Sequence, residues 1–163
     1  MTPEAREIVQ AIGCEIVARG AATPPPPMDL GAERLVVAGL LCDACPEDVE
    51  LRREDFCSPL LGAVYEMARL LRAEGMAVAI QPILLALREQ GWTGPIEIEL
   101  LRVRDEVPAV SRRDLEDAAE TIVELSERRR VLALCESVSA RLRSGSCDAV
   151  EAMTELEEVR RAG

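Results

Sequence analysis

The chain has 163 residues and a formal net charge of −11, from 19 basic and 30 acidic residues, and this length suits one domain with its own hydrophobic core. Every basic residue is an arginine, and the absence of lysine and histidine excludes P-loop nucleotide binding, Schiff-base chemistry, Ser-His or Cys-His nucleophiles and histidine metal sites. The acidic balance makes direct binding to nucleic acid or to an anionic membrane unfavourable, and no apolar run reaches the about 18 residues that cross a bilayer.

Residues 1–20 are predicted to form a first helix that is separate from the rest of the chain. Thr2 and Pro3 are typical of a helix start, and Gly20 closes the helix. Residues 21–28 follow as a linker with four consecutive prolines, which form a stiff polyproline spacer. We therefore expect the first helix to be an appendage that either packs back on the domain or reaches a different protein.

Residues 29–108 are predicted to form a compact helical head. Asp29 caps a helix through Leu41 that is apolar on nearly every side, which is typical of a central, buried helix, and Pro46 begins a short helical turn. The segment 95–106 alternates like a strand at its start, but its longer apolar stripe favours a helix, since one isolated strand would have nothing to pair with. The remaining helix starts and ends are marked by Ser58-Pro59, Gly75, Gln81-Pro82 and Gly91.

Residues 109–163 are predicted to form a long antiparallel helical hairpin. Ser111 and Asp114 make an S-x-x-D capping box, after which apolar residues recur every three or four positions until Gly145 ends the first helix. The stripe shifts near the middle of this helix, so its two halves are expected to face different neighbours. A hairpin of this length cannot bury both of its apolar stripes on itself. The predicted fold class is therefore all-α, a multi-helix head followed by a hairpin that needs a partner.

The first half of the long helix supplies the candidate partner-binding residues. Arg128 and Arg129 are candidates because arginine binds carboxylates through paired hydrogen bonds, although a solvated or salt-bridged face is the alternative. The apolar candidates sit where the helix leaves the head and are expected to line an interface with another chain, or alternatively to pack on the chain's own last helix; they are Leu115, Ala118, Ile122 and Leu125. In the second half, the apolar positions are expected to face the last helix, with Val131, Leu134, Val138 and Leu142 opposite Val150, Met153 and Leu156.

Six cysteines are present, and the sequence lacks the pattern of a secretory signal, so we expect a cytoplasmic protein with free thiols. Cys42 and Cys45 form a C-x-x-C pair. A thioredoxin-like site needs a βαβ context, and a four-sulfur zinc site needs a second pair, whereas only Cys57 lies nearby in the sequence. We interpret these thiols as core-filling side chains and expect no metal and no cofactor.

Several segments between residues 29 and 161 occur in a familiar order and spacing, although no single one of them is specific. They are ERLVVAGLL at 33–41, REDF at 53–56, the helix from Ser58 to Gly75, LREQG at 87–91 and RRRVL at 128–132. In this order they resemble the N-terminal domain of DnaB-type hexameric replicative DNA helicases. The sequence departs from that family at Ala77-Val78-Ala79, where the family has PID, and at residues 94–97, where it has GG..YL. It also ends at Gly163 without the ATPase domain that follows in those helicases.

This resemblance implies a role in DNA replication. In those helicases the domain is the collar of the ring, dimerises through its hairpin, assembles the dimers with three-fold symmetry and receives primase or, in some systems, a loader. The resemblance therefore implies a non-enzymatic interaction module that forms a homo-oligomer, a dimer or a trimer of dimers. Primase, replicative helicase or a loader would be its partners, with no direct nucleic-acid binding and no membrane contact.

Two other classes of function remain open from the sequence. One is a purely structural helical domain, a relic of a truncated helicase with no retained partner. The other is a metal or redox protein built on Cys42 and Cys45.

Overall fold

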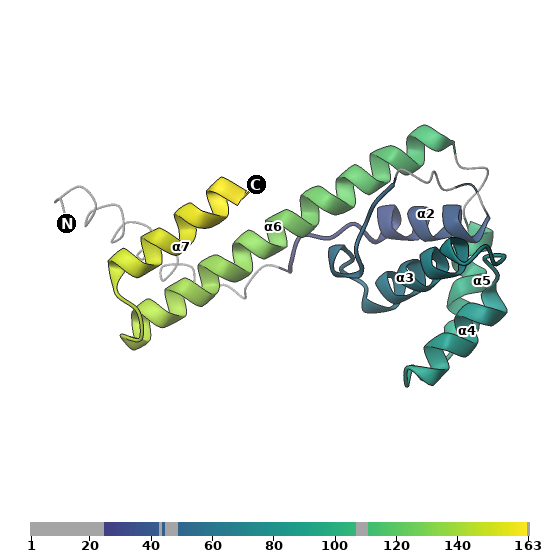
Figure 1. Cartoon of the computed structure of the whole chain (residues 1–163), viewed down its shortest axis with the longest axis horizontal. Coiled ribbons are helices and arrows are strands. Elements are labelled where there is room, and N and C mark those ends of the chain that lie inside the picture. Colours follow the sequence, from purple (N-terminus) through teal and green to yellow (C-terminus); the bar gives the residue numbers. More distant parts are fainter. Residues whose placement is uncertain (1–24, 43, 45–48, 107–110, 163) are drawn as a thin grey trace.

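The computed structural model describes residues 25–42, 44, 49–106 and 111–162 of the chain. All of the regular structure in these residues is helical, which confirms the predicted all-α class (Figure 1). The elements are α2 (Leu30–Leu41), the 3-10 turn η1 (Arg53–Asp55), α3 (Pro59–Ala73), α4 (Ile80–Glu89), α5 (Ile96–Glu106), α6 (Arg112–Ser144) and α7 (Ala149–Ala162). The predicted helix at residues 1–20 and the short turn after Pro46 fall outside the described residues.

Several helices begin at the predicted residues because side-chain hydrogen bonds satisfy their free backbone amides. The helix α4 begins at Ile80, just before the predicted Gln81-Pro82, and has no side-chain cap. The Asp29 carboxylate accepts from the amides of Gly31 and Ala32 at 2.9 and 3.0 Å, and the Ser58 hydroxyl accepts from the amide of Leu61 at 3.3 Å. These two caps confirm the starts of α2 and α3. The segment from Ile96 onward is helical, as its longer apolar stripe predicted.

The long helix α6 has the predicted capping box at its start. The Ser111 hydroxyl accepts from the amide of Asp114 at 3.2 Å, and the Asp114 carboxylate accepts from the amide of Ser111 at 3.1 Å. Gly145 ends the helix with a φ of 71°, a left-handed conformation that glycine adopts without steric cost. Asp148 then caps α7 by accepting from the amides of Val150 and Glu151.

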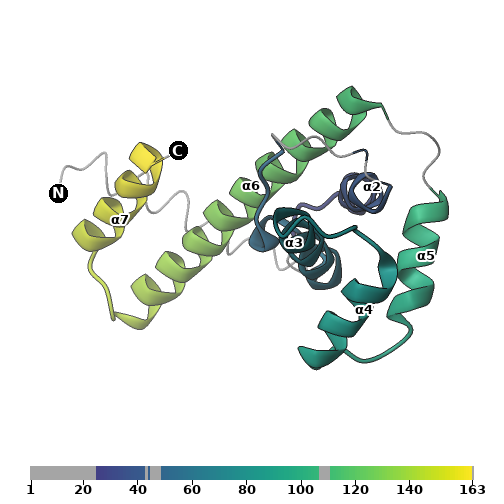
Figure 2. The same cartoon turned by 45° about the vertical axis from the view of Figure 1, so that its right-hand side comes forward.

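The helix α2 lies at the centre of the head and contacts α3, α5 and α6 (Figure 2). Val36 and Val37 are fully buried on it. Gly39 permits the close approach of α6, because a Cβ atom at this position would lie 2.6 Å from a methyl carbon of Leu115. The main core consists of side chains from the helices of the head, from the connecting residues Val49, Leu51 and Phe56, and from the first part of α6. It therefore crosses the domain boundary that was expected near residue 108.

Two polar side chains hold the connections of the head in place. Glu33 is 2% exposed, and its carboxylate accepts from the amides of Cys57 and Ser58 at 2.5 and 3.0 Å, so it secures the chain just before α3. Tyr65 is 1% exposed; its hydroxyl donates to the carbonyl of Val49 at 2.9 Å and accepts from the amide of Leu51 at 3.2 Å. The extended segment 49–51 is thereby fixed against α3.

Beyond the head, α6 continues as a single helix and α7 folds back beside its far end (Figure 1). A second, small cluster joins them, in which Val138, Cys147 and Ala152 are buried and Leu134 and Leu142 pack against them. The two halves of α6 thus face different neighbours, as the shift in its apolar stripe predicted.

The pairing expected between α6 and α7 is wrong in part. Val131, Val150 and Met153 were expected to face each other but are 48%, 74% and 51% exposed. The reason is the rotation of α7 about its own axis, which turns Ala152 toward α6 and leaves Val150 and Met153 in solvent.

Candidate interaction surface

Three of the apolar candidates on α6 are buried inside the chain itself. Leu115, Ala118 and Ile122 are 0%, 6% and 2% exposed, and Ala118 and Ile122 belong to the core of the head. From the sequence, these residues were expected to lie either at an interface with another chain or against the last helix. The structure shows neither arrangement, because the three side chains pack on the head. The close contact that Gly39 allows with Leu115 explains why this side of α6 packs on the head.

The remaining candidates lie at the edge of this contact. Leu125 is half-buried, and Arg128 is exposed and donates to the carboxylate of Glu124 at 2.5 Å. Arg129 donates to the carbonyl of Pro27 at 2.8 Å and to that of Asp55 at 2.6 Å, so it ties the chain before α2 to the long helix. A partner-binding role for Leu125 and Arg128 stays a prediction, whereas the Arg129 guanidinium already bonds within the chain.

Asp55, which the sequence analysis did not single out, connects the 3-10 turn η1 to the long helix α6. It is 7% exposed and accepts from the Ser126 hydroxyl at 2.9 Å, from the amide of Arg52 at 2.8 Å and from the Arg130 guanidinium at 2.6 Å. The REDF segment at 53–56 was noted only for its resemblance to a family turn. Its contact with Ser126 joins residues 71 positions apart, a separation at which no sequence spacing signals a contact.

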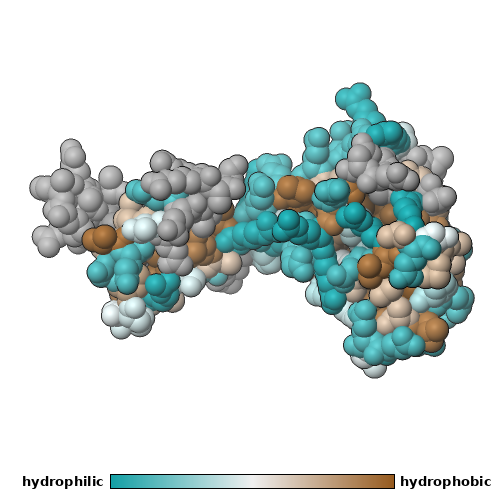
Figure 3. Space-filling view, in the orientation of Figure 1, coloured by the Kyte–Doolittle hydropathy of each residue, from teal (hydrophilic) through white to brown (hydrophobic). Residues whose placement is uncertain are grey.

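The far part of α6 and the adjacent α7 leave large apolar side chains in solvent. We refer to Val131, Leu132, Val150 and Met153 as the distal apolar residues; they are 48%, 50%, 74% and 51% exposed. Figure 3 shows apolar surface over this end of the molecule, separated from the apolar areas of the head by a hydrophilic band. Exposed apolar area of this kind is typical of surfaces that bind other proteins.

The described residues contain no group of three or more His, Cys, Asp or Glu side chains placed to hold a metal ion. Cys42 is free and exposed, so the expectation that it fills the core is wrong, and Cys45 lies outside the described residues. Within the same residues, no helix is both long and apolar enough to cross a membrane.

Two titratable groups of the α6–α7 region have shifted pKa values. Burial raises the pKa of the Cys147 thiol, because desolvation disfavours the thiolate. Hydrogen bonds from Ser111 lower the pKa of the Asp114 carboxyl, because they stabilise its charged form. Both shifts arise from structural contacts, one in the small cluster and one in the helix cap.

Comparison with known proteins finds a structural relative. No family model matches the sequence, and no curated protein matches it. The fold is similar to the crystal structure of the N-terminal domain of DnaB helicase from Mycobacterium tuberculosis, with a TM-score of 0.68 and 26% sequence identity. The match covers 82% of this chain and 99% of that chain. The similarity thus extends over nearly the whole of that helicase domain.

Proposed function

We propose that this chain is a non-enzymatic module of DNA replication that self-associates and binds primase, a replicative helicase or its loader. The observation that carries this proposal is the structural similarity to a DnaB N-terminal domain over nearly the full length of that domain. The resembling segments in the sequence support the same assignment, because they occur in the family's order along the helices.

The distal apolar residues support self-association. Val131 and Leu132 on α6 and Val150 and Met153 on α7 remain about half exposed or more, and each buried Å² of apolar surface contributes about 25 cal/mol to association before entropic costs are subtracted. In the helicases that this chain resembles, the corresponding hairpins form the dimer contact. We place the contact between copies at these four residues instead of at the buried Leu115, Ala118 and Ile122.

A non-enzymatic role is supported by the residue types available. The sequence has no histidine and no lysine, which are the side chains that most often serve as bases or amine nucleophiles near neutral pH. A site for acid–base chemistry would have to rely on carboxylates, cysteine thiols or the single tyrosine, Tyr65.

The first test is the oligomeric state. Sedimentation or light scattering of the full chain at micromolar concentration should give a species larger than a monomer. The double variant Val131→Asp, Met153→Asp should shift it toward the monomer, because a charge in a dry interface is unfavourable. The double variant Leu85→Asp, Ile98→Asp is the matched control, since Leu85 on α4 and Ile98 on α5 are apolar residues that are 62% and 57% exposed. A strict monomer for the unmodified chain would overturn the self-association part.

The second test is partner capture. The purified chain should bind the primase or the replicative helicase of its own host in a pairwise pull-down with purified proteins. If the chain binds none of primase, helicase and loader, the alternative of a structural relic without a retained partner is favoured.

A further inference from the structure

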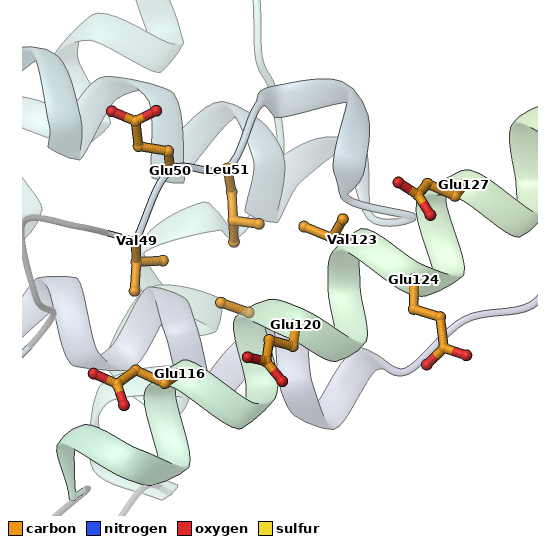
Figure 4. Close-up of a pocket in the computed structure, with 9 residues that line it drawn as sticks. Val49, Glu50, Leu51, Glu116, Glu120, Val123, Glu124 and Glu127 are labelled. Atoms are coloured by element: carbon orange, nitrogen blue, oxygen red, sulfur yellow. The ribbon is translucent and has the colours of Figure 1, made fainter. Parts of the chain in front are cut away.

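A groove runs between the extended segment 49–51 and one side of α6, with a volume of about 440 Å³. The segment contributes Val49, Glu50 and Leu51. The helix contributes residues that recur along one side, and these are Glu116, Ala119, Glu120, Val123, Glu124 and Glu127. Figure 4 shows Leu51 and Val123 pointing toward one another across the groove, with Glu50 on the segment and the other labelled glutamates along the helix.

The floor of the groove is apolar and held in place. Val49, Leu51 and Ala119 are 9%, 4% and 8% exposed, and the small Ala119 side chain leaves room above it. Val123 is 38% exposed, so apolar surface is open to an incoming side chain. The two hydrogen bonds of Tyr65 fix the backbone of segment 49–51. A ligand would therefore meet a floor that is already formed, which lowers the entropic cost of binding.

The rim of the groove is acidic. Glu116 and Glu124 pair with Arg112 and Arg128, at 2.6 and 2.5 Å, on the same helix. The other three glutamates, at positions 50, 120 and 127, form no ion pair with a basic side chain in the part of the chain that the structure describes. Glu120 lies one helical turn from both Glu116 and Glu124, whose charges are offset by Arg112 and Arg128, but its own charge has no such arginine. A cation beside Glu50, Glu120 or Glu127 would supply the missing countercharge.

We propose that this groove binds a basic amphipathic helix of a partner protein. The partner's apolar side chains would insert between Leu51 and Val123, and its arginines or lysines would pair with Glu50, Glu120 and Glu127 on the rim. From residue 116 to residue 127 the rim extends about 17 Å at 1.5 Å per residue, which is about three turns of a docked helix. An apolar groove that receives the apolar face of a helix is a common mode of peptide recognition.

Charge complementarity selects this occupant over two others. A second copy of the chain carries a net charge of −11, so it would bring like charge to an acidic rim. Phosphate backbones are repelled for the same reason. A basic amphipathic helix can place apolar side chains on the floor and positive charges beside the glutamates of the rim.

This inference rests on the proposed function in one respect, namely that the chain acts by binding other proteins. The groove shares no residue with the four distal apolar residues at which self-association is placed. Binding at the groove and self-association can therefore fail independently.

The test uses the full chain and a fluorescein-labelled synthetic helix of about 18 residues with leucine on one face and arginine on the other. Fluorescence anisotropy should show saturable binding that weakens as salt is raised. Two control peptides should bind more weakly by about tenfold or more, one with the same composition but no apolar face, the other with glutamate in place of arginine.

Variants of the chain locate the site. The double variant Glu120→Arg, Glu127→Arg should weaken binding of the basic helix by about tenfold or more, because it places like charges opposite its arginines. The matched control is Glu89→Arg, Glu136→Arg, which makes the same change in net charge at exposed glutamates outside the groove. Val123→Ser should weaken binding severalfold while Val150→Ser does not.

Three results would overturn the proposal: no saturable binding of the basic helix, equal weakening by the control pair, or equal binding of the peptide without an apolar face. Sedimentation of the same variants is run alongside. If Glu120→Arg, Glu127→Arg dissociates a homo-oligomer, the occupant of the groove is a second copy and the proposal is wrong. If the unmodified chain is a monomer but binds the basic helix, self-association fails while this inference stands.

Discussion

Asp55 and Arg130 are 75 residues apart in the sequence, yet a carboxylate oxygen of Asp55 lies 2.6 Å from a guanidinium nitrogen of Arg130. The pair is asymmetric, because the Asp55 side chain is 10% exposed whereas that of Arg130 is 56% exposed. The same carboxylate accepts from Ser126 on α6 and from the amide of Arg52. Asp55 therefore joins the turn before α3 to the midpoint of the long helix, at the place where α6 leaves the head.

Replacing Asp55 should cost more stability than replacing Arg130. Asp55→Ala leaves the Ser126 hydroxyl and the Arg52 amide without their acceptor, and we expect the free energy of unfolding to fall by about 1–3 kcal/mol. Arg130→Ala removes only a solvent-screened pair, for which the expected loss is below about 1 kcal/mol. Urea denaturation measures both, with Glu54→Ala as the exposed neighbouring control. A larger loss for Arg130→Ala would contradict this assignment.

The same substitution at the adjacent positions 122 and 123 should lower the stability by very different amounts. Ile122 is 2% exposed in the core of the head, whereas Val123 is 38% exposed. Ile122→Asp should lower the stability by about 4 kcal/mol or more, because it buries an unpaired carboxylate, and Val123→Asp should cost less than about 1 kcal/mol. Circular dichroism and urea denaturation distinguish the two. A folded Ile122→Asp protein that merely loses its oligomeric state would restore the sequence-based interpretation of Ile122 as an interface residue.

The two thiols of the α6–α7 region should differ in reactivity. Cys147 is 8% exposed in the small cluster, and burial raises its pKa, so at neutral pH less of it is the reactive thiolate. Cys135 is exposed on α6. Mass spectrometry after brief treatment with iodoacetamide should therefore show modification of Cys135 well before Cys147. Equal rates in the native protein would mean that α7 does not stay packed on α6, and denatured protein provides the reference in which the burial of Cys147 is lost.

The capping box of α6 should make part of the stability dependent on pH. Hydrogen bonds from Ser111 lower the pKa of Asp114 below its usual value of 3.8. A lowered pKa in the folded state means that the stabilisation is complete above the unfolded value and is lost as the pH falls through the folded value. Asp114→Ala should therefore be less stable than the unmodified chain at neutral pH, and the difference should shrink as the pH falls below the usual value of 3.8. Glu120→Ala serves as the control, and a difference that is independent of pH would argue against the cap as its source.

The helix limits could be predicted because their signals are local. Asp29, Ser58 and the Ser111–Asp114 pair each bond to backbone groups two or three residues away, and Gly145 ends α6 through its own φ angle. Such interactions are encoded within one turn of helix, so the chain specifies them before any tertiary contact forms. The all-α class was readable from the periodicity of apolar residues within each helix. The resemblance to a helicase domain was readable from the order of short segments along the chain.

The neighbours of each apolar face could not be predicted in this way. The periodic stripe showed that Leu115, Ala118 and Ile122 share one side of α6, but not whether that side meets the head, the last helix or another chain. The same limitation applies to α7, where the rotation of the helix about its own axis decides that Ala152 is buried and Val150 is exposed. Periodicity identifies a buried side and carries no information about what covers it.

By itself, the sequence determined an arginine-only, acidic, all-helical chain with defined helix ends, since composition and short-range hydrogen bonds require no folded context. Only the tertiary structure decided that the first half of α6 completes the head, and that the segment held by Tyr65 lies opposite a row of glutamates. Those arrangements depend on contacts between residues far apart in the sequence, such as Asp55 with Ser126 and Arg130. The geometry of these contacts is set by how whole helices pack against one another. The spacing of residues along the sequence does not determine it.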